Sequence, residues 1–139
     1  MADGRRAARR AAAFTLYQQD LMGLTADAAL QRSEQAGPAP APYTRRLVLG
    51  VAERGLQIDE FLGRHLKAWT LERLAPLERS ILRLAVFEML AVEDVPTVVA
   101  IDEAVELAKR FASIEAATLV NGVLAAVAAE IATDRGPEA

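Results

Sequence analysis

The sequence predicts an all-α fold, and three observations support this prediction. Alanine, which has the highest helix propensity, fills 29 of the 139 positions. Valine, isoleucine and threonine never accumulate into runs typical of strands. Apolar residues make up 53% of the chain and charged residues 25%, which is typical of a globular protein. We therefore expect a single helical domain over residues 1–139 that is large enough to bury a core.

The first half of the chain, residues 1–67, is expected to form an N-terminal helical subdomain. Gly23 should end its first helix, and Thr25 suits the N-cap of its second. Alternate prolines exclude a helix from the following segment. In order, we expect a helix over 4–22, a helix over 25–35, a proline-rich loop over 37–42, and over 43–67 either one helix or two that break near Gly55.

The second half, residues 68–132, is expected to form a C-terminal helical subdomain, which brings the total to about seven helices. Pro76 suits the first turn of a helix, and Thr97 and Ser113 suit N-caps. The predicted elements are helices over 76–91, 97–111 and 113–132, followed by a tail over 133–139. The helix over 76–91 is apolar almost all round, so it belongs in the middle of a bundle.

The last predicted helix contains a glycine, Gly122, within an otherwise strong helical pattern. A glycine at such a position costs about 1 kcal/mol relative to alanine. We expect close helix–helix packing to be the reason for it. The inward face should carry Val120, Val123, Leu124, Val127 and Ile131.

Positive charge is concentrated at the N-terminus, although the net charge of the chain is −3. Residues 1–10 carry four arginines and one aspartate, while the rest of the chain carries 12 basic and 18 acidic residues. The four arginines are Arg5, Arg6, Arg9 and Arg10. On a helical wheel they form a stripe beside Phe14, Leu21, Ala7 and Ala11, with Tyr17 at the border. The stripe is either a basic arm for a polyanion or a solvated N-terminus.

The sequence offers no catalytic residues and no site for a metal or cofactor, so we do not expect an enzyme. It contains no cysteine, and its one histidine, His65, has apolar neighbours that favour a half-buried helix position. Asp102, Glu103 and Glu106 have no histidine beside them and are typical of a solvated acidic face. Glycine-rich phosphate-binding motifs are absent. No apolar run approaches the roughly 18 residues of a membrane span, so we expect a cytoplasmic protein without a membrane partner.

Five segments, in this order and spacing, resemble the NusB family of bacterial transcription antitermination factors. They are RRAARRAAAFTLYQ, LVLGVAERGLQID, W-x-LERLAPLERSILRLAVFEML, DVPTVVAIDEAVELAKRF and LVNGVLAAVA. The resemblance covers roughly Arg5 to Ile131, and its most specific part is Trp69 to Leu124. It implies an all-helical protein built as two small helical bundles packed together.

The resemblance also implies a function in transcription. Members of the family form a heterodimer with NusE, a protein of the small ribosomal subunit. This pair recognises the boxA element of nascent ribosomal RNA leaders and, with other Nus factors, holds RNA polymerase in a termination-resistant state. Some members self-associate as homodimers, which buries part of the RNA surface.

Individual positions match functional residues of the family. The expected RNA-binding residues are Arg5, Arg6, Arg9, Arg83 and Leu119, and the expected partner-binding residues are Tyr17, Glu72, Glu78 and Glu115. Glu115 falls where the family carries an acidic residue tied to antitermination. Arg10 stands where the family often has an acidic residue. Leu119 stands where many members have a phenylalanine, and it cannot stack on a base, a contact worth about 1–3 kcal/mol.

Two other functions remain open at this point. NusB-like domains occur at the start of some ribosomal RNA methyltransferases, although this chain contains no nucleotide-binding strand–loop–helix unit. A protein–protein adaptor that has lost RNA binding is the second alternative, because of Leu119. The RNA hypothesis requires that the N-terminal guanidinium groups lie beside the packed helices and not beneath them.

Overall fold

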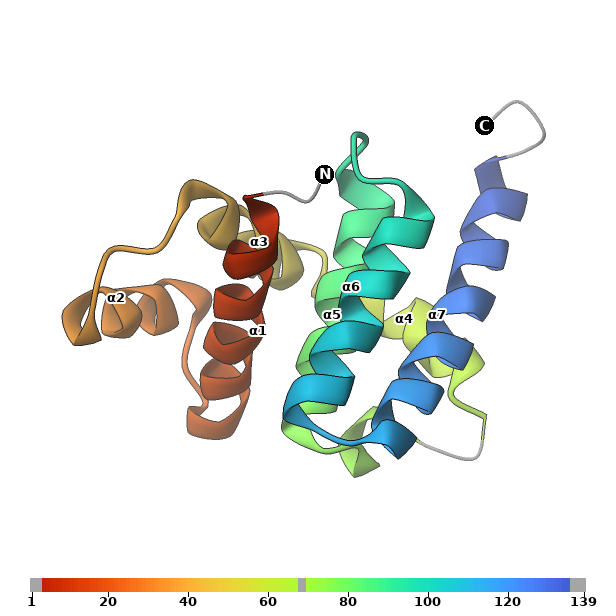
Figure 1. The fold of residues 1–139 in the computed structure, drawn as a ribbon, viewed down its shortest axis with the longest axis horizontal. Coiled ribbons are helices and arrows are strands. Elements are labelled where there is room, and N and C mark those ends of the chain that lie inside the picture. Colours follow the sequence, from red (N-terminus) through yellow and green to blue (C-terminus); the bar gives the residue numbers. More distant parts are fainter. Residues whose placement is uncertain (1–3, 68–69, 136–139) are drawn as a thin grey trace.

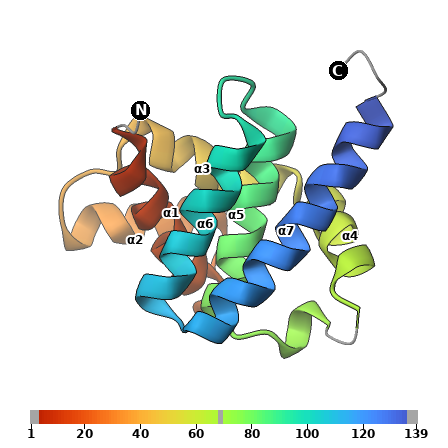
Figure 2. The same ribbon diagram turned by 45° about the vertical axis from the view of Figure 1, so that its right-hand side comes forward.

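The computed structural model describes residues 4–67 and 70–135, and these form seven α-helices and one 3-10 helix with no strand (Figures 1 and 2). The helices are α1 (Arg5–Met22), α2 (Ala26–Ala36), α3 (Pro42–Glu53), α4 (Gly55–His65), η1 (Leu71–Arg73), α5 (Pro76–Ala91), α6 (Thr97–Phe111) and α7 (Ile114–Arg135). The all-α prediction is confirmed. Trp69, part of the family-like segment, lies outside the described residues.

Short-range signals in the sequence set most of the helix ends. Gly23 ends α1 in the left-handed conformation, with φ of 65°, which suits a glycine. The Thr25 hydroxyl accepts a hydrogen bond from the backbone N–H of Ala28 at 3.1 Å and caps α2. The Ser113 hydroxyl accepts one from the N–H of Ala116 at 2.9 Å and caps α7 in the same way.

Three expectations about helix ends need correction or completion. Thr97 is the first residue of α6 and makes no capping hydrogen bond, because the extended Pro96 precedes it as the N-cap residue. The 43–67 segment forms two helices, α3 and α4, that meet at Arg54. The last helix continues to Arg135, three residues beyond its predicted end, and the short helix η1 was not predicted.

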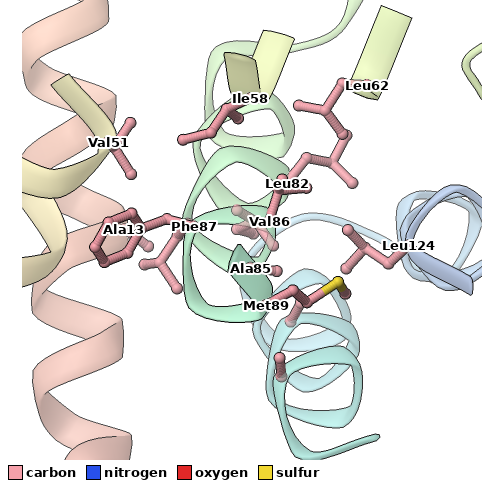
Figure 3. Close-up of a cluster of buried hydrophobic side chains, with 14 of the residues drawn as sticks. Ala13, Val51, Ile58, Leu62, Leu82, Ala85, Val86, Phe87, Met89 and Leu124 are labelled. Carbon is pink, nitrogen blue, oxygen red and sulfur yellow. The ribbon is translucent and has the colours of Figure 1, made fainter. Parts of the chain in front are cut away.

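Helix α5 lies at the centre of the molecule and packs against α1, α3, α4, α6 and α7. Its side chains enter the core on several sides. In Figure 3, Phe87 points toward Ala13 of α1 and Val51 of α3, while Leu124 of α7 lies on the opposite side of α5. One cluster of buried hydrophobic residues includes members of both halves of the chain. The division into subdomains at residues 67 and 68 stays a prediction.

Helix α7 is long and apolar enough to cross a membrane by length and composition, although no apolar run of that length was expected. Its five predicted inward residues are all buried. It packs against α6, α5 and α4. We interpret α7 as a helix of the bundle, because these five valine, leucine and isoleucine side chains pack against the neighbouring helices.

Two helical glycines differ in their surroundings. A Cβ atom on Gly50 of α3 would lie 2.2 Å from the ring of Phe87, so this glycine permits the close approach of α3 to α5. A Cβ atom on Gly122 would meet nothing within 4 Å. The expected packing reason for Gly122 is therefore wrong.

Candidate nucleic-acid and partner interface

Helix α1 is rotated relative to the expected helical wheel. Its buried residues are Ala8, Arg9, Ala12, Ala13, Thr15 and Leu16. Ala7, Ala11 and Leu21, which were expected on the apolar side, are exposed. The four arginines therefore do not form one exposed stripe: Arg9 faces the core, and Arg6 and Arg10 face outward.

Arg9 is buried in an ion pair with a buried acid. Its side chain is 2% exposed, and its Nε lies 2.8 Å from Oε2 of Glu88, whose side chain is 0% exposed. The Tyr43 hydroxyl donates a hydrogen bond to the same carboxylate. Nη1 of Arg9 lies 3.8 Å from Oε1 of Glu103. This network joins α1 to α3, α5 and α6, so the expected display of Arg9 on the surface is wrong. A direct contact between Arg9 and RNA would require the network to open.

Burial also changes the titration of the tyrosine in this network. The pKa of the Tyr43 hydroxyl is raised well above its ordinary value. Desolvation by burial is the largest cause, and the hydrogen bond to Glu88 is the next. The neutral hydroxyl is thus retained as a donor to Glu88. Glu88 was not among the predicted residues, because an acid on an otherwise apolar helix gives no local sign of its partner.

Arg5 and Arg6 also contact carboxylates, but their side chains are more exposed to solvent than that of Arg9. Arg5 Nη2 lies 3.1 Å from Oδ2 of Asp94, and the guanidinium lies 4.4 Å from the centre of the Tyr43 ring. The hydrogen bond to Asp94 is the largest cause of the raised pKa of Arg5. Arg6 donates to both oxygens of Glu103, at 3.1 and 2.8 Å, and its side chain is 66% exposed. The Arg5–Asp94 pair has an exposed carboxylate, and such a pair contributes only about 0–1 kcal/mol, so a phosphate can compete with Asp94 for this guanidinium.

Glu103 was expected to belong to a solvated acidic face. Its side chain is only 14% exposed, because the guanidinium of Arg6 covers it. Arg10, one turn further along α1, is exposed and makes no ion pair within residues 4–67 and 70–135. The positive charge that remains uncompensated on this face of α1 therefore belongs to Arg10, for which the resemblance gave no role.

The expected partner-binding residues Tyr17, Glu72 and Glu78 lie on elements that Arg79 brings together. Arg79 donates to Asp20 near the end of α1, at 2.8 and 3.0 Å. It also donates to the carbonyl oxygens of residues 71, 72 and 74, which holds η1 against the start of α5. Glu72 is exposed, whereas Tyr17 and Glu78 are half-buried.

Arg83 lies with this second group and not with Arg5 and Arg6. Its guanidinium donates to both oxygens of Asp59, at 2.9 and 3.1 Å. It lines a shallow hollow with Asp20, Glu72 and Arg79. The structure therefore separates Arg83 from the N-terminal arginines, with which it was expected to bind RNA.

Leu119 and Glu115 lie on α7, and α6 stands between α7 and α1 (Figure 2). Leu119 is half-buried against the hydrophobic core, and Glu115 is exposed in the first turn of the helix. A ligand that contacts both Leu119 and the arginines of α1 must therefore cross α6.

His65 has the structural role that its neighbours indicated. It is half-buried, and its Nε2 lies 2.7 Å from Oε1 of Glu130, which also accepts a hydrogen bond from Arg64 at 2.9 Å. These contacts join α4 to α7. No group of three or more histidine, aspartate or glutamate side chains suited to a metal occurs in the part of the chain that the structure describes.

Comparison with known proteins places the chain in a family. The model of the NusB family matches residues 6–129. A transcription antitermination protein NusB of Geobacillus kaustophilus (strain HTA426) is 44% identical over 127 residues, which cover 91% of this chain and 97% of that protein.

Two solved structures have a similar fold. T. maritima NusB has a TM-score of 0.82 and 34% sequence identity, and the match covers 94% of each chain. A structure of the antitermination factors NusB and NusE in complex with dsRNA has a TM-score of 0.80 and 28% identity, covering 91% of this chain and 96% of that one. From its sequence, its helical architecture and these matches, the chain belongs to the NusB family.

Proposed function

We propose that this chain is an RNA-binding transcription antitermination factor. The observation that carries this proposal is the 44% identity, over nearly the whole chain, to a relative named as a transcription antitermination protein. The similarity to a NusB that was solved with NusE and dsRNA supports both an RNA and a protein partner. We propose no enzymatic activity, and we place the protein in the cytoplasm, where transcription takes place in bacteria.

The finer proposal concerns the ligands. The chain pairs with NusE, and the pair binds the boxA element of nascent ribosomal RNA. With other Nus factors, this complex helps RNA polymerase to resist termination. The relative that matches over 97% of its length is named as an antitermination protein, which supports this function over RNA modification.

The RNA-facing side of the proposal rests on the N-terminal turn of α1. Arg5 holds Asp94 at the surface, where an exposed ion pair is weak, and the Arg6 side chain is 66% exposed beside Glu103. A phosphate can replace such a carboxylate, because guanidinium binds both groups through two parallel hydrogen bonds. Binding through a few phosphates gives a modest affinity that falls as salt concentration rises.

The partner-facing side rests on Tyr17, Glu72 and Glu78, which lie on α1, η1 and α5, the three elements that the hydrogen bonds of Arg79 join. The chain beyond its first ten residues carries 12 basic and 18 acidic residues, so its field attracts a basic ribosomal protein. Tyrosine suits the centre of such an interface, because it combines apolar area with a polar tip.

A filter-binding titration with a boxA oligomer, with and without NusE, tests this function. We expect NusE to tighten binding and a scrambled oligomer to bind more weakly. The variant Arg5→Ala/Arg6→Ala should lose RNA affinity and retain NusE binding. Equal binding of boxA and scrambled RNA, or no effect of NusE, would contradict the proposal.

Two observations favour a second candidate, a protein–protein adaptor without RNA binding. Arg5, Arg6 and Arg9 all contact carboxylates of this same chain, and Leu119 replaces an aromatic residue. The adaptor hypothesis predicts that this chain binds NusE normally but adds nothing to the affinity of NusE for RNA. The same titration therefore separates the two functions.

A further inference from the structure

Helices α1 and α6 lie side by side and run in the same direction (Figure 2). Arg6 pairs with Glu103, and eight residues further along both helices the rings of Phe14 and Phe111 meet edge to face, with centroids 5.0 Å apart. Between these two bridges the helices enclose a groove of about 330 Å³. We call it the α1–α6 groove. It is lined by Ala7 and Leu107 and by the charged residues Arg6, Arg10, Glu103, Glu106 and Arg110.

Two guanidinium groups on opposite sides of the α1–α6 groove are available to a ligand. Arg10 of α1 and Arg110 of α6 are both exposed, and neither makes an ion pair within the described ranges. The guanidinium of Arg110 lies 5.1 Å from the centre of the Phe111 ring. This cation–π contact holds the group at the edge of the groove, while its N–H donors stay directed away from the ring.

The charge of the groove favours an anion. Glu103 is covered by Arg6 and also lies 3.8 Å from Arg9, so its negative charge is largely compensated. Glu106 is exposed and has no ion pair in the described part of the chain. With Arg6 and Glu103 paired to each other, the guanidinium groups of Arg10 and Arg110 remain against the single carboxylate of Glu106.

The mixed apolar and charged lining of the groove favours a polynucleotide over a small anion. Ala7 and Leu107 give it apolar lining that a ribose or a base can cover, while the arginines at its edges reach phosphates. The groove also lies along α6, and α6 stands between α1 and α7 (Figure 2). An RNA strand that contacts both α1 and α7 must cross α6.

We propose that the α1–α6 groove binds the backbone of a single RNA strand, with Arg10 and Arg110 on successive phosphates. This inference rests on the proposed RNA-binding function. It gives Arg10 and Arg110 the phosphate contacts that were expected of Arg9, which is buried against Glu88.

The test is the salt dependence of boxA binding by the complex of this chain with NusE. Each phosphate contact to a single strand contributes about 0.7 to the slope of log affinity against log salt concentration. The variant Arg10→Ala/Arg110→Ala should therefore lower the magnitude of this slope by about 1.4, so the affinity of the wild type relative to the variant falls about 25-fold for each tenfold rise in salt. The control Arg32→Ala/Arg45→Ala removes two exposed arginines outside the groove and should leave the slope unchanged.

A variant that removes a negative charge from the groove identifies the class of ligand. Glu106→Gln removes the uncompensated acid of the groove and should tighten RNA binding. A basic protein in the groove would give the reverse: Glu106→Gln would weaken its binding and Arg10→Ala/Arg110→Ala would tighten it. That pattern, or an unchanged salt slope in the double arginine variant, overturns the inference.

The outcomes separate this inference from the proposed function. Wild-type protein that adds no RNA affinity to NusE overturns both. Wild-type protein that binds boxA, together with a double arginine variant that binds equally well at every salt concentration, overturns only the groove. Thermal unfolding should give wild-type stability for all three variants, because the substituted side chains are exposed.

Discussion

The ion pair between Arg9 and Glu88 gives the sharpest prediction about the stability of this protein. The two residues lie 79 positions apart in the chain and join α1 to α5 in the core. Both side chains are almost fully buried, and the Tyr43 hydroxyl donates to the same carboxylate. We therefore expect the substitutions Arg9→Met and Glu88→Met to be strongly coupled.

The magnitude follows from what each substitution leaves behind. Removing one partner of a buried ion pair costs about 3–5 kcal/mol of unfolding free energy, because the other charge remains buried without compensation. Replacing both charges with methionine removes this penalty. The double variant should lose only about 1–2 kcal/mol, mainly because the Tyr43 hydroxyl loses its acceptor. The coupling free energy should thus be at least about 4 kcal/mol.

Urea unfolding of the wild type, the two single variants and the double variant measures this coupling. Because a small domain has a stability of about 5–15 kcal/mol, a single variant that is too unstable can be replaced by Glu88→Gln, which keeps an acceptor oxygen. The partly exposed pair Arg83 and Asp59 serves as the control. Its coupling should be about 0–1 kcal/mol.

Additive effects of Arg9→Met and Glu88→Met would refute the reasoning. A double variant that is less stable than either single variant would do the same. Either result would mean that the two charges do not compensate each other in the folded protein, and that the guanidinium of Arg9 is free to serve another purpose, such as RNA binding.

Three further predictions concern stability. Gly50→Ala should destabilise by about 1–3 kcal/mol in urea unfolding, because the new Cβ would lie 2.2 Å from the ring of Phe87; wild-type stability would show that α3 and α5 can separate freely. Gly122→Ala should stabilise by up to about 1 kcal/mol, since the added methyl group meets open space within a helix; a loss of stability would point to an unrecognised contact. The hydrogen bond from Arg64 is the largest cause, and that from His65 the next, of the lowered pKa of Glu130. The ionised carboxylate therefore stabilises the fold at neutral pH, and this stabilisation is lost as pH falls below the ordinary carboxyl range. Glu130→Gln should therefore lower Tm at neutral pH and flatten its decline with acid; an unchanged pH profile would argue against this contact.

The sequence by itself determined the local structure of this protein. Gly23, Thr25, Ser113 and Pro76 fix helix ends through conformations and hydrogen bonds that involve residues only a few positions away. The all-α class and the family resemblance follow from the same kind of information, since each depends on residue types at short spacings.

Tertiary structure decided which face of each helix is buried. A helical wheel places arginine outside, because an isolated buried charge is too costly. Arg9 is nevertheless in the core, because Glu88 and Tyr43 approach from α5 and α3 and compensate its charge. In the same arrangement, Arg10 is exposed across the α1–α6 groove from Arg110. Such compensation depends on the packing of residues far apart in the chain, and no local pattern encodes it.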